Sequence, residues 1–433
     1  MARSVWGRAI PLVLVALAAC TDAPLQSASS APGPALALAT QRAPEQVVGG
    51  EVVVRFRGGA DIDGVLAAHR LTRADAGYRG SFVVARGLVG NEHASARALR
   101  ADRAVEWAEP NYLRTADAIR PELWAFFNPG NLTVTFSKGQ NRGAVVASYL
   151  SAADADMDNI EGYAAGGSPV VIGSIDTGVE MNHPEFGNRL IAGRDWYSND
   201  NDPSDEDGHG THTTGTMAGA TVGVAGVSGA AANVRVYVQR VCGRRGCPSA
   251  AIANAIRAAA DQGVVAVNLS LGGASESQAE KDAITYAVER NVLVIASAGN
   301  NGSGTVGCPA CDPKAISVGA TNWQDEKAYY TQFGPGLDIV APGGELYSNT
   351  TSQAGIFSAY RGGTFAYLQG TSMAAPQVTG TAAIVASKLG LSGSALRARL
   401  ESTADPLGSA TDFGNGRVNS YRAVTGGTLG GGQ

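Results

Sequence analysis

Apolar runs alternate with small-residue helical patterns from about residue 160 to residue 425. The runs are rich in Val, Ile and Ala and are bounded by Gly, Asn or Pro, which is typical of buried strands. Six of them predict strands: VVIGSID, NVRVYVQRV, GVVAVNLSLGG, NVLVIASAGN, AISVGAT and LDIVAPG. Helical patterns such as SAAIANAIRAAADQG and AEKDAITYAVER lie between them. Near-continuous apolar strands joined by helices predict an α/β unit whose mostly parallel sheet is covered on both faces.

A smaller unit precedes this one, at residues 46–115. EVVVRFR, GSFVVARG and AVEWAEPNYL read as strands, and DIDGVLAAHR and HASARALRAD read as helices. This β-α-β-α-β order predicts a small α+β, ferredoxin-like domain with two helices on one face of its sheet. No residues within it have a catalytic spacing.

Composition narrows the class of protein. The 433 residues are enough for two to three domains. A net charge of −5 provides no basic surface for nucleic acid, so we expect no nucleic-acid partner. The 57 glycines and a charged fraction of 16% are typical of a compact protein with many tight turns.

The N-terminus predicts export. Arg3 and Arg8 precede the apolar run IPLVLVALAA, which is typical of a signal peptide over residues 1–19. The run ends in Leu-Ala-Ala-Cys20, which resembles a bacterial lipobox and implies lipidation of Cys20 and tethering outside the cytoplasm. Ordinary cleavage with release of a secreted protein is the alternative. The Ser/Ala/Pro-rich segment up to residue 45 predicts a flexible tether, and no later segment predicts a transmembrane helix.

The four remaining cysteines form an even set. In an oxidising compartment we expect two local disulfides, Cys242–Cys247 and Cys308–Cys311. A zinc site is the alternative, but the spacings in CGRRGC and CPAC do not match each other.

Three polar residues lie where strands or helices of the larger unit begin or end. Asp176 ends a strand, His209 opens the helix in GHGTHTTGT, and Ser372 precedes a helix in GTSMAAPQV. Each has a structural alternative: a turn aspartate, half of a metal pair with His212, and a close-packing helix start with Pro376 in its first turn. Together, the order Asp, His, Ser with gaps of 33 and 163 residues is one in which the serine-protease triad occurs.

The segments IDTGVEMNHPEF, DGHGTHTTGTMAG and GTSMAAPQVTG resemble the Asp, His and Ser boxes of the subtilisin-like serine protease family. The resemblance covers about residues 165–424 and implies a three-layer subtilisin-like fold over residues 161–425. It implies a serine endopeptidase with Asp176, His209 and Ser372 as the triad and Asn300 in the oxyanion hole. Residues 46–115 resemble the inhibitory propeptide of such enzymes. We therefore expect a monomeric, autoprocessed zymogen that acts on protein or peptide substrates.

The resemblance also implies binding residues. Ser270, Leu271, Gly272 and Gly273 match the strand that pairs with extended substrate, and Ala298, Gly299 and Gly307 match the walls of the P1 pocket. The glycine at position 307 predicts a roomy, uncharged pocket for large apolar P1 residues. The acidic loop YSNDNDPSDEDG resembles a calcium loop, with Asp200, Asp202 and Asp205 as ligands. A solvated acidic loop is the alternative.

Departures from the family leave some points open. Thr213 and Thr214 stand where the family commonly has a Val-Ala pair, which we interpret as a mild change facing the helix side. Residues 116–160 match poorly, so they are a linker or an N-terminal arm and the maturation site is not placed; residues 426–433 predict a flexible tail.

Two other functions fit the sequence less well. An inactive peptide-binding scaffold with this fold would be expected to lack a triad residue or Asn300. An esterase is disfavoured because the sequence around Ser372 lacks the second glycine of GxSxG and because the serine follows the acid and the base.

Overall fold

The structure is a computed structural model that describes residues 47–116, 167–219, 227–228, 233–322, 324–346 and 355–426. The predicted signal peptide, Cys20, the tether, residues 117–160 and the tail beyond 426 lie outside the described residues. The described residues belong to one compact unit. No helix within these ranges is long and apolar enough to cross a membrane.

Residues 47–116 form an antiparallel sheet with two helices. The elements run β1 (Val47–Phe56), α1 (Ile62–Ala68), β2 (Thr72–Asp75), a 3₁₀ turn at Tyr78–Gly80, β3 (Val83–Arg86), α2 (Glu92–Arg100) and β4 (Val105–Ala116). The sheet order is β4-β1-β3-β2, with every pair antiparallel. The β-α-β-β-α-β order is ferredoxin-like. The sequence did not predict β2 because all four of its residues are exposed, so no buried alternation marks it.

The larger unit is built on a seven-stranded sheet in the order β13-β12-β11-β9-β5-β7-β6, in which every pair is parallel. All six predicted apolar runs form strands. The edge strand β6 was not predicted, because its residues are mostly half-buried and its apolar run is only three residues long. The strands are β5 (Val170–Asp176), β6 (Leu190–Asp195), β7 (Val234–Arg240), β9 (Ala266–Leu269), β11 (Leu293–Ser297), β12 (Ile316–Thr321) and β13 (Ile339–Pro342).

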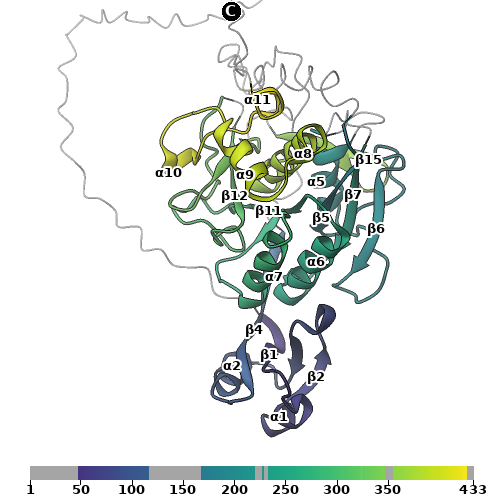
Figure 1. Cartoon of the computed structure of the whole chain (residues 1–433), viewed down its shortest axis with the longest axis vertical. Coiled ribbons are helices and arrows are strands. Elements are labelled where there is room, and N and C mark those ends of the chain that lie inside the picture. The colour runs from purple at the N-terminus through teal and green to yellow at the C-terminus, as the bar shows by residue number, and fades with distance from the viewer. Residues whose placement is uncertain are drawn as a thin grey trace, which may run out of the picture. The chain divides into compact units, whose positions relative to one another are not determined.

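Helices cover both faces of this sheet (Figure 1). Along β5, Ile172 packs into one buried cluster and Ile175 into the other, as the alternation of a strand requires. The cluster of Ile172 contains α5 (His209–Ala218), α8 (Thr371–Leu389), α9 (Gly393–Ser402) and α11 (Ser420–Thr425). The cluster of Ile175 contains α6 (Ser249–Gln262) and α7 (Gln278–Val288). The fold is the three-layer α/β architecture that the sequence predicted, with helices on both faces of a parallel sheet.

The remaining elements are short. They are β8 (Cys247–Pro248), β10 (Leu271–Gly272), the hairpin of β14 (Ile356–Tyr360) and β15 (Thr364–Leu368), and α10 (Ala410–Phe413). Three neighbouring strands of the main sheet, β5, β9 and β11, lead at their carboxyl ends to Asp176, Ser270 and Asn300. Ligands of parallel sheets meet this edge, so the fold gathers the predicted site residues there.

Candidate active site

Asp176 and His209 are in direct contact. Asp176 is the last residue of β5, and His209 is the first residue of α5. The Nδ1 of His209 lies 2.6 Å from Oδ1 of Asp176, and both side chains are buried. Oδ1 also accepts from the backbone N–H of Thr177 at 2.7 Å. An acidic acceptor at Nδ1 fixes the imidazole so that Nε2 is the basic nitrogen.

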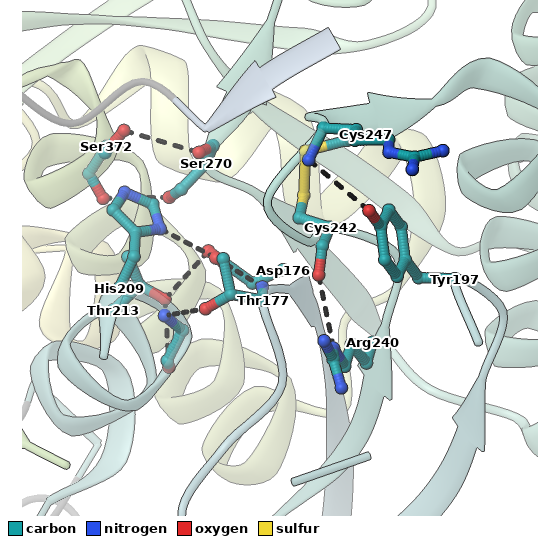
Figure 2. The surroundings of a disulfide bond; sticks show 12 residues. Asp176, Thr177, Tyr197, His209, Thr213, Arg240, Cys242, Cys247, Ser270 and Ser372 are labelled. Atoms are coloured by element: carbon teal, nitrogen blue, oxygen red, sulfur yellow. Dashed lines mark hydrogen bonds and ion pairs between the residues drawn. A yellow bond between two sulfur atoms is a disulfide. The ribbon is translucent and has the colours of Figure 1, made fainter. Parts of the chain in front are cut away.

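The environment of His209 sets its basicity. Burial alone would lower the pKa of His209. The charge of Asp176 and the hydrogen bond to it outweigh burial, and the negative charges of Asp207 and Asp205 contribute in the same direction, so the pKa of His209 is raised. Its Nε2 is buried and has no hydrogen-bond partner within the described ranges. Figure 2 shows the imidazole between Asp176 and Ser372. The nitrogen that faces away from Asp176 is therefore available to accept a proton.

Ser372 is the second residue of α8 and is buried. Its Oγ donates to the backbone carbonyl of Ser270 at 3.3 Å. In return, the Ser270 hydroxyl donates to the backbone carbonyl of Ser372 at 2.8 Å. This pair of contacts fixes the start of α8 against the chain that follows β9.

Pro376 is the sixth residue of α8, so it does not meet the condition of lying in the first turn, where a proline is readily tolerated. A residue at this position would normally donate its N–H to the carbonyl of Ser372, four residues earlier, and proline has no N–H. The hydroxyl of Ser270 satisfies that carbonyl instead. The proline is tolerated because a neighbouring strand supplies the missing donor.

Asn300 is oriented by Thr371. The side-chain Oδ1 of Asn300 accepts from the backbone N–H of Thr371 at 2.8 Å and from its hydroxyl at 2.9 Å. Both contacts use the oxygen end of the amide, so the NH₂ end is the donor that an oxyanion would meet beside the helix start. Gly299 has φ +105° and leaves no room for a side chain, since a Cβ there would lie 1.9 Å from Oε1 of Gln332.

The predicted binding residues lie together. Gly273 exchanges two backbone hydrogen bonds with Cys308, each 2.8 Å, and the N–H of Gly307 donates to the carbonyl of Ala298 at 2.8 Å. A Cβ at Gly307 would lie 3.2 Å from the Ala298 carbonyl and 3.4 Å from that of Gly273. The absence of a side chain at position 307 therefore allows these two segments to approach closely.

Both predicted disulfides are present, so the zinc alternative does not hold. The Cys242–Cys247 disulfide lies beside the end of β5 (Figure 2). The N–H groups of Val241 and Cys242 donate to the backbone carbonyl of Asp176 at 2.8 and 3.1 Å. Cys308–Cys311 closes the loop that pairs with Gly273. Each disulfide fixes a segment that borders the site.

His212 takes no part in the site. Its Nε2 donates to the carbonyls of Ile356 and Ala366 at 2.9 and 3.2 Å, which ties α5 to the β14–β15 hairpin. Burial, with a further contribution from the charge of His209, lowers the pKa of His212 to about 3. The side chain is therefore neutral near pH 7.

The three predicted calcium ligands do not form one carboxylate cluster within the described ranges. Asp205 instead orders the start of α5, because its oxygens accept from the N–H groups of Asp207, Gly208 and Thr211 and from the hydroxyls of Thr177 and Thr211. Asp205 therefore fits a metal site poorly. Asp200 and Asp202 are exposed, and each accepts hydrogen bonds only from its own loop.

Sequence reasoning missed the supporting threonines. The hydroxyl of Thr177 donates to Asp205 and accepts from the N–H of Gly210, which joins the end of β5 to the start of α5. Thr371 orients Asn300. Thr213, which was expected to face the helix side, lies 3.1 Å from Oδ2 of Asp176. Of these three threonines, only Thr213 had a signal in the sequence, because Thr213 and Thr214 depart from the family's common Val-Ala pair.

Comparison with known proteins identifies the family. The subtilase family pattern matches residues 167–416. The chain is 38% identical to a thermophilic serine proteinase of Bacillus sp. (strain AK1) over 78% of this chain and 77% of that protein. It is 38% identical to thermitase of Thermoactinomyces vulgaris over 60% of this chain and 90% of thermitase.

A solved structure shows the same fold. Fervidolysin from Fervidobacterium pennivorans, a keratinolytic enzyme related to subtilisin, matches with a TM-score of 0.68 and 25% identity. The match covers 90% of this chain and 62% of fervidolysin, so the chain spans less than two thirds of that protein. The chain belongs to the subtilase family. It is a subtilisin-like serine endopeptidase.

Proposed function

We propose that this endopeptidase cleaves protein substrates through an acyl-enzyme on Ser372, and that it is exported as a zymogen that its own activity processes. The observation that carries the zymogen proposal is the course of β4. Its last residues pair with β8 on one side and with β10 on the other.

The site supports acyl transfer as follows. His209 Nε2 takes the proton of the Ser372 hydroxyl as Oγ forms a bond to the substrate carbonyl carbon, and it later gives that proton to the leaving amine. Asp176 holds the imidazole and stabilises its charged form. The N–H of Ser372 and the amide of Asn300 supply donors to the oxyanion, since both lie at the positive end of α8 or beside it. Water then releases the acyl group by the same proton transfers in reverse.

The pairing of β4 is the kind that an extended substrate would make. Leu113 and Arg114 pair with Pro248 and Cys247, while Thr115 and Ala116 pair with Gly272 and Leu271. An extended peptide gains its affinity from such main-chain pairing. The residue that precedes Leu271 is Ser270, whose carbonyl accepts from Ser372 Oγ. The direction of β4 is therefore toward the nucleophile.

Two polar residues of β4 bind the starts of surface helices. Glu109 accepts from the N–H groups of Gln278 and Ala279 at 2.6 and 3.0 Å, at the start of α7. Asn111 accepts from the N–H of Ala250 at 3.2 Å, at the start of α6. Helix N-termini carry unsatisfied N–H groups and a partial positive charge, so both contacts are favourable. They support a propeptide role for residues 47–116.

Export, lipidation at Cys20 and calcium remain proposals that rest on the sequence. The signal pattern of residues 1–19 carries the first two. For calcium, the proposal is limited to the loop that holds Asp200 and Asp202, because Asp205 is already used by α5. If the melting temperature of the protein does not change when a chelator is added, the proposal of a structural calcium ion is wrong.

The test compares the export-competent chain with Ser372→Ala, using intact mass and casein hydrolysis. If the proposal holds, only the wild type loses an N-terminal fragment that ends downstream of residue 116, and only the wild type degrades casein. If both proteins stay full length and neither cuts casein, the inactive peptide-binding scaffold replaces this proposal. If Ser372→Ala is also processed when expressed alone, the processing is not autocatalytic.

A further inference from the structure

The second carboxylate oxygen of Asp176 has a partner outside the triad. Oδ1 accepts from His209 and from the N–H of Thr177. Oδ2 lies 3.1 Å from the hydroxyl of Thr213 (Figure 2). The carboxylate is therefore held at both oxygens, and two of the three donors, His209 and Thr213, are side chains of α5.

The helix places Thr213 for this contact. Thr213 follows His209 by four residues, so the two side chains lie on one face of α5, over successive turns. Thr213 and Asp176 are both fully buried. A buried hydroxyl must donate to an acceptor, since no water competes for its proton.

Two acceptors are within reach of this hydroxyl. Besides Oδ2 of Asp176 at 3.1 Å, the backbone carbonyl of Gly210 lies at 3.2 Å. A hydroxyl has one proton. The carboxylate is the stronger acceptor because hydrogen bonds to an ionised group are about twice as strong as neutral ones. The hydroxyl therefore favours Asp176.

We propose that Thr213 is a positioning residue of this protease, whose hydroxyl fixes the carboxylate plane of Asp176 and thereby the imidazole of His209. The inference rests on the proposed roles of Asp176 and His209. A carboxylate bound through Oδ1 alone can rotate about its Cβ–Cγ bond, and such rotation tilts the imidazole away from Ser372. Thr213 would act through Asp176 and would touch no substrate.

The hydroxyl also affects proton affinity. A donor on Oδ2 withdraws negative charge from the carboxylate and so weakens its stabilisation of the protonated imidazole. Removing the donor should raise the pKa of His209 further. The other ionisable groups that act on His209 are Asp205 and Asp207 in the preceding loop and the neutral His212 on α5, and the substitution leaves all three in place.

The experiment uses the full chain with Thr213→Val, which keeps the shape and removes the hydroxyl. The rescue variant is Thr213→Ser. The control is Thr216→Val, which removes a buried hydroxyl of the same helix that donates to the His212 carbonyl and does not contact Asp176. For each variant, kcat and KM for a peptide substrate are measured per titrated active site across pH, and the melting temperature is recorded.

For Thr213→Val we expect kcat to fall roughly ten- to hundredfold with KM within about twofold, the size expected from losing one hydrogen bond to a charged group. The acidic limb of kcat/KM should move upward by ~0.5–1 pH unit. Thr213→Ser should restore both values, and Thr216→Val should change neither. If Thr213→Val does not mature, Thr213→Ala takes its place, because its smaller side chain cannot clash with Asp176.

Other outcomes overturn the inference. A lower melting temperature with unchanged kcat and an unchanged acidic limb would make Thr213 purely structural. An equal loss in Thr216→Val would assign the effect to packing of α5. Asp176→Asn separates this inference from the proposed function: if it retains full activity, the triad assignment itself fails. If it abolishes activity while Thr213→Val matches the wild type, only the role of Thr213 is lost.

Discussion

Two buried carboxylates, Asp176 and Glu109, are held in different ways. The donors to the carboxylate of Asp176 all come from the same unit: the N–H of Thr177, which directly follows β5, and two side chains of α5. The donors to Glu109 all come from outside residues 47–116: the hydroxyl of Ser277 and the N–H groups of Gln278 and Ala279. The hydrogen bonds at Asp176 therefore do not depend on the N-terminal segment, whereas Glu109 would lose every one of these partners if that segment were removed.

The hydrophobic packing shows the same difference. The sheet of residues 47–116 and its helices enclose a core of only ten buried residues. On the opposite face, Val53, Phe82 and Val84 pack into the cluster that contains α6 and α7. A core this small is marginal alone, so much of the stability of the N-terminal segment comes from the catalytic unit. The larger unit is stabilised by its own core, whereas residues 47–116 depend on packing against that unit.

The largest effect is expected at the oxyanion donor. Asn300→Leu should lower kcat by about 10²–10³, a range measured on a member of this family, with little change in KM. Its matched control is Asn301→Leu, because Asn301 is exposed and bonds only the nearby N–H of Ser303. Steady-state kinetics on a peptide substrate check both variants. Equal losses in the two would exclude Asn300 as the oxyanion donor.

A substitution at Glu109 should weaken only the N-terminal segment. In the Ser372→Ala full chain, Glu109→Ala leaves three donors at the start of α7 unsatisfied, which costs about 2–3 kcal/mol. Hydrogen exchange should show lost protection over residues 47–116 and unchanged protection in the main sheet. Glu106→Ala is the control, since Glu106 is exposed and pairs only with Arg55. A loss that extends to β5 and β9 would mean that the two regions unfold together.

Removing either disulfide should have a smaller effect, confined to the catalytic unit. Replacing Cys242 and Cys247 by serine should cost about 2 kcal/mol, since short closed loops gain little chain entropy. Replacing Cys308 and Cys311 should cost a similar amount and also raise KM, because that loop pairs with Gly273. Thermal unfolding and KM measured side by side test the contrast. If the two double-serine variants have equal KM values, the Cys308–Cys311 loop does not contribute to substrate binding.

The smallest effect concerns pH. The raised pKa of His209 means that the base is protonated, and activity lost, as pH falls through a value above the ordinary 6.5 of histidine. The same shift stabilises the fold below pH 6.5, and this contribution is lost as pH rises through the folded pKa. His212, with a pKa of about 3, should leave the acidic limb unaffected. A pH–rate profile whose acidic limb lies below 6.5 contradicts this account.

The sequence determined the features that depend on local order. The six apolar runs predicted the central strands because buried strands need continuous Val and Ile. The close spacing within CGRRGC and CPAC predicted both disulfides, since each pair is local. The three boxes predicted which residues would meet, and the structure brings Asp176 and His209 into contact.

The tertiary structure decided where individual side chains point. Exposed β2 carries no apolar run and half-buried β6 carries only a short one, so their pairing partners define them. The proline in α8 is tolerated because Ser270, 102 positions from Ser372 in the sequence, supplies the missing donor. Thr213 and Asp205 look like a substituted helix residue and a calcium ligand in the sequence, yet each bonds a neighbour that only the folded chain places beside it. Hydrogen bonds between distant segments depend on distances of a few ångströms, and no local pattern records them.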